Sequence, residues 1–226
     1  GAVLTGRRRE PPCDPWPHPR GRGHTPPAAA GLRVDSRRRG VENSRVLGGD
    51  PPAAGRTEAG DYEYAVERLA ESTATDSFSF GVAAHPEVHP RSPDRETDRR
   101  HLAAQLRLAD FAITLCFFEA VHWRRLVDEL ADLGVDKPVL PGIMPITQLA
   151  QVQRMAAMSG AEVPRWLVER LERAADPDQV RRIGVEVAAD LVAELLDAGA
   201  PGVHLYTLNR PDSAKQICAL LRNPGS

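Results

Sequence analysis

The feature that most constrains the fold is an alternation of short apolar runs with amphipathic stretches, which begins near residue 41 and continues to the end of the chain. The apolar runs carry few polar residues on either side, as in SFGVAA (79–84) and FAITLCF (111–117). Strands that are apolar on both faces are typical of a parallel sheet covered by helices. The sequence therefore predicts an α/β fold.

About five βα units can be recognised. We expect strands at 45–49, 79–84, 111–117, 139–144 and 203–208. We expect helices at 61–72, 92–108, 120–133, 147–158, 163–174, 177–198 and 212–221. Ser92 followed by Pro93 predicts the N-cap of one helix, and Gly134 and Gly199 predict two helix ends. Pro141 and Gly142 interrupt the fourth strand.

Two architectures satisfy this pattern, a doubly wound open sheet and a (β/α)8 barrel. A doubly wound dinucleotide-binding sheet would carry a Gly-rich turn after its first strand, and Gly21 and Gly23 give only G-x-G within a Pro/Arg-rich segment. In a barrel the site is built from polar residues at the carboxyl ends of the strands. Such residues follow every predicted strand: Asp50, His85, His89, Glu119, Thr147, Gln148, Asn209 and Arg210. This recurrence favours the barrel.

Residues 1–40 differ from the rest of the chain, because arginines and prolines are interleaved and no periodicity survives. Prolines remove backbone donors and like charges repel each other, so we expect a disordered leader before a domain at 41–226. A nucleic-acid-binding arm, a transit peptide and a frame-shifted segment are the alternatives. The transit peptide is disfavoured because no amphipathic helix is visible.

Composition narrows the function classes. A formal net charge of −2 gives no general attraction to nucleic acid or to acidic membranes, and no apolar run is long enough to span a bilayer. The three cysteines are far apart, which fits a reducing, cytoplasmic setting better than a disulfide framework. His85 and His89 lack a third ligand at suitable spacing, so we expect no metal site.

Five segments carry a resemblance to a known family. They are GGDPP (48–52), HPEVHP (85–90), PGIMPIT (141–147), AEVPRWL (161–167) and HLYTLNR (204–210). Their order and spacing over residues 41–221 resemble the bacterial methylenetetrahydrofolate reductases. The resemblance implies a (β/α)8 barrel that binds FAD. It also implies reduction of 5,10-methylenetetrahydrofolate to 5-methyltetrahydrofolate at the expense of NADH or NADPH.

The resemblance also implies roles for individual residues. Asp50 stands at the family's aspartate beside flavin and pterin, and is the candidate catalytic residue. Gln151 and Arg210 stand at folate-contacting positions. Leu115 stands where the family has a substrate-contacting glutamine. The positions that correspond to cofactor contacts are His18, Gly48, Gly49, Asp50, His85, His89, Asp98, His101 and Gln105.

Several of these positions depart from the family pattern. Gly48 replaces an arginine, Gln105 a lysine and His85 a tyrosine, while the family's catalytic glutamate motif has no match in the chain. We therefore expect an incomplete barrel whose first strands are missing. Its open edges would be covered by the leader, by a partner chain as in a homo-oligomer, or by nothing. A non-catalytic folate- or flavin-binding remnant and a flavin-independent reductase are the alternative functions.

Overall fold

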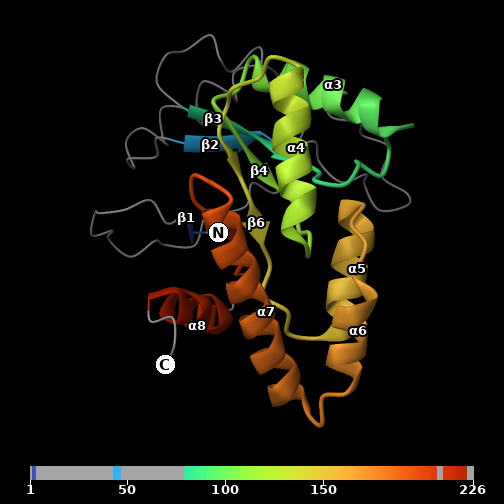
Figure 1. Ribbon diagram of the computed structural model, residues 1–226, viewed down its shortest axis with the longest axis vertical. Helices are drawn as coiled ribbons and strands as arrows, with labels where there is room; N and C mark the ends of the chain where they lie inside the picture. The colour runs from blue at the N-terminus through green and yellow to red at the C-terminus, as the bar shows by residue number, and fades with distance from the viewer. Residues whose placement is uncertain (1, 4–42, 47–78, 208–210, 223–226) are drawn as a thin grey trace, which may run out of the picture.

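Short strands and longer helices alternate along the computed structural model, which describes residues 2–3, 43–46, 79–207 and 211–222 (Figure 1). The strands are β1 (Ala2–Val3), β2 (Asn43–Val46), β3 (Ser79–Ala84), β4 (Phe111–Thr114), β5 (Val139–Leu140), β6 (Gly142–Ile143) and β7 (His204–Leu205). The helices are α3 (Arg95–Leu106), α4 (Ala120–Asp132), α5 (Leu149–Ser159), α6 (Arg165–Glu172), α7 (Pro177–Asp197) and α8 (Pro211–Arg222).

Each parallel pair joins two strands that follow each other in the chain. One sheet has the order β2-β3-β4-β5 and is parallel throughout, and β6 pairs with β7 in parallel in a second sheet. The crossings that the structure describes are helical: α3 links β3 to β4, α4 links β4 to β5, and α5 to α7 link β6 to β7. The predicted α/β class with parallel strands is therefore confirmed. The incomplete (β/α)8 barrel stays a prediction.

Only Pro141 separates β5 from β6, and Thr114 joins the two sheets at this break. The amide of Gly142 donates to Thr114 Oγ1 at 2.8 Å, and the hydroxyl of Tyr206 donates to the Thr114 carbonyl at 2.9 Å. A Cβ on Gly142 would lie 2.0 Å from that carbonyl oxygen. The close approach of β6 to β4 thus requires glycine at position 142.

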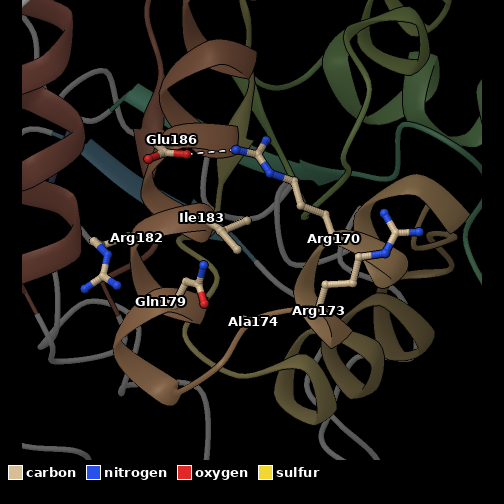
Figure 2. Close-up of a pocket in the computed structure, with 7 residues that line it drawn as sticks. All are labelled: Arg170, Arg173, Ala174, Gln179, Arg182, Ile183 and Glu186. Carbon is tan, nitrogen blue, oxygen red and sulfur yellow. Dashed lines mark hydrogen bonds and ion pairs between the residues drawn. The ribbon is translucent and has the colours of Figure 1, made fainter.

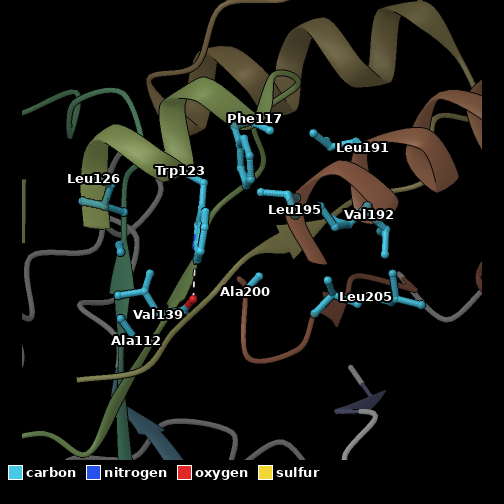
Figure 3. Close-up of a cluster of buried hydrophobic side chains, with 14 of the residues drawn as sticks. Ala112, Phe117, Trp123, Leu126, Val139, Leu191, Val192, Leu195, Ala200 and Leu205 are labelled. Carbon is cyan, nitrogen blue, oxygen red and sulfur yellow. Dashed lines mark hydrogen bonds between the residues drawn. The ribbon is translucent and has the colours of Figure 1, made fainter. Parts of the chain in front are cut away.

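The main apolar core lies between the strands and helices α3, α4, α7 and α8 (Figure 3). Trp123 of α4 is buried within it and donates from Nε1 to the Val139 carbonyl at 3.1 Å. Leu126 and Leu195 are fully buried, and burial of such a side chain contributes about 1.5–3 kcal/mol. A smaller core forms around α5 and α6, where Ile146, Val152 and Leu167 are buried.

The two faces of β3 have different neighbours. Phe80, Val82 and Ala84 point into the main core. Gly81 pairs with Phe111 on the opposite face, where a Cβ would lie 2.3 Å from the Phe111 ring. The aromatic ring therefore covers Gly81 across the strand pair.

The predicted helix boundaries hold best where glycine ends a helix. Gly134 and Gly199 follow α4 and α7 with φ of +73° and +91°, as expected for a left-handed stop. The predicted N-cap at Ser92 is wrong. Asp94 caps α3, because its Oδ1 accepts from the Thr97 amide at 2.7 Å.

Most strands differ from the prediction as well. The strand predicted at 139–144 is divided into β5 and β6, and the strand predicted at 203–208 is His204–Leu205 in the described residues. The strand predicted at 111–117 ends at Thr114, although the Leu115 amide still donates to the Ala84 carbonyl. The strand predicted at 45–49 is Asn43–Val46 in the described residues, and the helix predicted at 61–72 lies outside them.

Part of the predicted leader takes part in the fold. Ala2 and Val3 form β1, which pairs antiparallel with β7 and covers the edge of that strand. These two residues precede the arginines and prolines of the segment, so their amides remain able to enter a ladder. None of the helices in the described ranges combines the length and apolar character needed to cross a bilayer.

Candidate functional site

The candidate site lies at the carboxyl end of β3, where a turn carries His85 and His89. The two rings are 4.3 Å apart between centroids. His85 Nδ1 lies 2.8 Å from the Ser159 carbonyl oxygen, which can only accept, so Nδ1 carries the proton. The Arg91 amide donates to His89 Nδ1 at 3.0 Å, so this nitrogen carries the lone pair. In their neutral forms the two histidines therefore adopt opposite tautomers.

Both imidazoles are held in the neutral form. Burial lowers the pKa of His85 and outweighs the hydrogen bond to Ser159, which raises it. Burial and the charge of Arg91 lower the pKa of His89. At neutral pH His85 Nε2 is consequently an acceptor and His89 Nε2–H a donor.

A buried arginine on α3 fixes this turn. Arg99 is 3% exposed and donates to the carbonyls of His85, Pro86 and Glu87 at 3.1, 2.7 and 2.9 Å. It also pairs with Asp98 and, through Nε at 2.6 Å, with Glu129 of α4. Asp98 is 8% exposed, and its other oxygen accepts from the His89 amide at 3.3 Å. Asp98 is thus tied to the turn as well.

The Glu129 carboxylate binds three guanidinium groups. Arg95, Arg99 and Arg125 all donate to its carboxylate. Its partial burial alone would raise its pKa, but these hydrogen bonds outweigh that effect and lower it. Glu129 therefore stays ionised and anchors α3 to α4.

The end of α5 supports the turn from the opposite side. Besides its carbonyl contact with His85, Ser159 has its hydroxyl 3.2 Å from the Sγ of Cys116, which follows β4. The Glu87 carboxylate accepts from the Glu162 amide at 3.1 Å. Gly160 has φ of +70°, and a Cβ there would lie 2.3 Å from the Val88 carbonyl. The turn is therefore held between α3 and the α5 C-terminus.

Gln151 lies at the other end of α5. Thr147 Oγ1 donates to Gln151 Oε1 at 2.9 Å, which leaves the amide NH2 directed to other partners. Ser159 is eight positions after Gln151, which corresponds to about 12 Å along a helix. Gln151 and the two imidazoles therefore lie near opposite ends of α5.

The remaining predicted residues fall in different places. His101 and Gln105 follow Asp98 on one face of α3, with His101 exposed and Gln105 half-buried. Leu115, half-buried, directly precedes Cys116. Five predicted site residues lie outside the described residues: His18, Gly48, Gly49, Asp50 and Arg210. Within the described ranges, no group of three or more His, Cys, Asp or Glu side chains is placed to hold a metal ion.

A cavity of about 400 Å³ lies between α6 and α7 (Figure 2). Arg170 pairs with Glu186 at 2.8 Å across it, whereas Arg182 points away from Arg170 and Arg173. None of the predicted site residues lines this cavity, and its guanidinium groups do not converge on one point.

Sequence reasoning missed Arg99 and Ser159. A signal for Arg99 was present, because it occupies the same helical stripe as the buried Leu102 and Leu106. A charge at a stripe position predicts a buried, paired group. No comparable signal marks Ser159, which contacts a histidine 74 positions away in the chain.

The fold and the site define an α/β protein with parallel strands and a polar site at their carboxyl ends. The family model described as methylenetetrahydrofolate reductase matches residues 32–222, and the chain belongs to this family. The resemblance inferred from the five motifs is therefore confirmed.

Individual relatives agree with the family match. The chain is 38% identical over 143 residues to a probable methylenetetrahydrofolate reductase (NADPH) of Caenorhabditis elegans, covering 62% of this chain and 22% of that protein. It is 30% identical over 200 residues to the 5,10-methylenetetrahydrofolate reductase of Escherichia coli (strain K12), covering 87% and 66%. The chain thus spans about a fifth of one relative and just under two thirds of the other.

A solved structure shares the fold. It is an uncharacterized protein from Clostridium thermocellum that binds two copies of 5-methyl-5,6,7,8-tetrahydrofolic acid. The TM-score is 0.51 at 15% sequence identity, and the match covers 70% of this chain and 58% of that chain. At this identity the likeness supports the α/β fold.

Proposed function

We propose that this chain carries the folate- and flavin-binding part of a methylenetetrahydrofolate reductase. The overall reaction converts 5,10-methylenetetrahydrofolate, NAD(P)H and a proton into 5-methyltetrahydrofolate and NAD(P)+. The observation that carries the proposal is the family match over residues 32–222. The names of the relatives and the folate ligand of the C. thermocellum protein support the same substrate class.

We further propose that the sheet belongs to an incomplete (β/α)8 barrel. Support comes from the strand order, because each parallel pair joins strands that follow each other in the chain. In a doubly wound sheet the strand order would reverse at a switch point, where two neighbouring strands would not follow each other in the chain. The predicted site residues after β3 and β6 are then at the carboxyl-end face, where barrel sites lie.

FAD is the proposed cofactor, and the residues at the β3 turn fit its polar groups. His89 Nε2–H can donate to a phosphate or ribose oxygen, and His85 Nε2 can accept from an N–H or hydroxyl group. His101 and Gln105 extend the same line of polar side chains along α3. When bound, the flavin supplies the hydride chemistry. The chain's own residues hold and orient it against the folate.

Gln151 is the proposed folate contact among the described residues. Because Thr147 occupies its Oε1, the amide presents N–H donors, which suit acceptor atoms on a pterin edge. The hydrogen bond from Thr147 also restricts rotation of the amide, so less entropy is lost when a ligand binds.

Leu115 favours a second candidate, a folate- or flavin-binding protein without reductase activity. Leucine cannot form the hydrogen bonds of the family's glutamine, and loss of a buried polar partner typically costs about 1–3 kcal/mol. A reductase that acts without flavin is a third candidate, favoured by Gln105 in place of the family's lysine.

The test begins with the purified chain. Its visible spectrum, before and after addition of FAD, reports flavin binding, and oxidation of NADH or NADPH with methylenetetrahydrofolate reports turnover. Flavin binding is the expected result, and flavin binding with turnover supports a reductase. Flavin binding without turnover favours the second candidate, and turnover without flavin favours the third. If the chain binds neither flavin nor folate and oxidises neither nucleotide, the proposal is wrong.

Gln151→Met tests the folate contact. Loss of its N–H donors should weaken folate binding about 5- to 150-fold, from a cost of about 1–3 kcal/mol. Gln153→Met is the matched control, because Gln153 is exposed on the same helix. Folate dissociation constants measured by titration should separate the two variants. Equal constants would contradict the role of Gln151.

A further inference from the structure

The guanidinium group of Arg99 uses all five of its N–H donors within the chain. Nε donates to Glu129, Nη1 to Asp98 and the His85 carbonyl, and Nη2 to the Pro86 and Glu87 carbonyls. Three consecutive carbonyls of one turn therefore converge on a single side chain. A planar fork with fixed donor directions suits such a set, and an ammonium group with three donors does not.

The Arg99 side chain is linked to both ends of the turn. At His85 it binds the backbone carbonyl directly. At His89 it acts through Asp98, whose Oδ1 accepts from the His89 amide while Oδ2 pairs with Arg99. The backbone positions of both histidines, and hence the 4.3 Å ring contact between them, are fixed from α3.

We propose that Arg99 is a positioning residue that holds His85 and His89 in opposite tautomers, with an acceptor and a donor ready for the flavin. The flavin part of this inference rests on the proposed function. The tautomer part rests on the chain's own contacts. Asp98 acts with Arg99 here, through the His89 backbone.

A merely structural role for Arg99 would lie in its bond to Glu129, which joins α3 to α4. Arg95 supplies the matched control. It lies on the same helix and donates to the same carboxylate, and no hydrogen bond from it to the turn is found in the described part of the chain. Arg95→Met therefore removes an ion pair with Glu129 and leaves the turn intact.

The experiment compares the unchanged chain with Arg99→Met, Arg99→Lys and Arg95→Met. Long-range 1H–15N NMR spectra of chain labelled with 15N-histidine identify the tautomers of His85 and His89. Assignments come from His85→Asn and His89→Asn. FAD affinity is measured in parallel by the quenching of flavin fluorescence. Circular dichroism checks that each variant is folded.

We expect the unchanged chain and Arg95→Met to show one imidazole protonated at Nδ1 and the other at Nε2. Arg99→Lys should show averaged tautomers and bind FAD at least about tenfold more weakly, because three carbonyls and Asp98 lose their fixed donors. If Arg99→Met does not fold, Arg99→Lys decides the question.

Opposite tautomers that persist in Arg99→Lys would overturn the inference, as would equal effects of Arg99→Lys and Arg95→Met on the imidazole signals. A different result would contradict the proposed function. If the unchanged chain shows opposite tautomers but does not bind FAD, the flavin assignment is wrong, while the Arg99 variants still test how the turn is held.

Discussion

Replacing Gly142 with alanine should break the junction between the two sheets. The added methyl group would lie 2.0 Å from the Thr114 carbonyl oxygen and 2.6 Å from Cε2 of Tyr206. Ordinary contact begins at 3.4 Å, so β6 and β4 must separate by about 3.4 − 2.0 = 1.4 Å. The φ of Gly142 is not positive, and the cost is therefore steric.

The magnitude follows from what the separation disrupts. It would stretch the Gly142 bond to Thr114 Oγ1 and the Tyr206 bond to the Thr114 carbonyl, now 2.8 and 2.9 Å, beyond hydrogen-bonding range. Two such bonds contribute about 1 kcal/mol each, and overpacking adds about 1–3 kcal/mol. Alanine also stabilises by about 0.4–1 kcal/mol through the unfolded chain. The expected loss is about 2–5 kcal/mol, or about 4–20 °C in Tm.

Thermal and urea unfolding, followed by far-UV circular dichroism, measure this loss. Gly134→Ala is the control, because Gly134 has φ of +73° and a Cβ added there would meet no atom within 4 Å. That variant isolates the conformational cost of a left-handed residue, about 1–2 kcal/mol. If Gly142→Ala loses no more stability than Gly134→Ala, the steric reasoning is refuted.

Two further predictions concern stability. The pKa of His85 is lowered in the folded chain, so the unfolded chain binds the proton first, and stability should fall as the pH drops through 6.5 toward the folded value. Urea unfolding between about pH 7.5 and about pH 5.5 measures this slope, which should flatten in His85→Asn; an unchanged slope would contradict it. Trp123→Phe removes the bond to the Val139 carbonyl and should cost about 1–3 kcal/mol, whereas Trp166→Phe, at a 45% exposed position, should cost under about 0.5 kcal/mol. Equal costs in urea unfolding would count against the Trp123 prediction.

Local signals explain which parts of the fold could be predicted from the sequence. Gly134 and Gly199 mark helix ends because a left-handed residue stops a helix whatever surrounds it. The start of α3 was harder, since Ser92 and Asp94 are both good caps and only the bond from the Thr97 amide distinguishes them. The break at Pro141 was visible, but the separate pairing of β5 and β6 depends on distant strands.

Part of the candidate site could likewise be predicted from the sequence, and part could not. His85 and His89 could be placed together because they follow one strand in one motif. The hydrogen-bond roles of the two imidazoles could not be predicted, because the role of His85 Nδ1 is set by the carbonyl of Ser159, 74 positions away. The resemblance identified Asp98 as a position of interest. The structure adds that its carboxylate is held by Arg99 and the His89 amide.

The position of Arg99 carries a last physical implication. It occupies a stripe otherwise filled by buried residues such as Leu102 and Leu106, where leucine would serve the core at no desolvation cost. Removing a guanidinium group from water costs several kcal/mol, and the ion pairs with Asp98 and Glu129 roughly offset that cost without a large surplus. Stability alone is therefore a weak reason for an arginine here. What leucine could not provide is a fixed set of donors for three consecutive carbonyls, and this is the property that orients the two histidines.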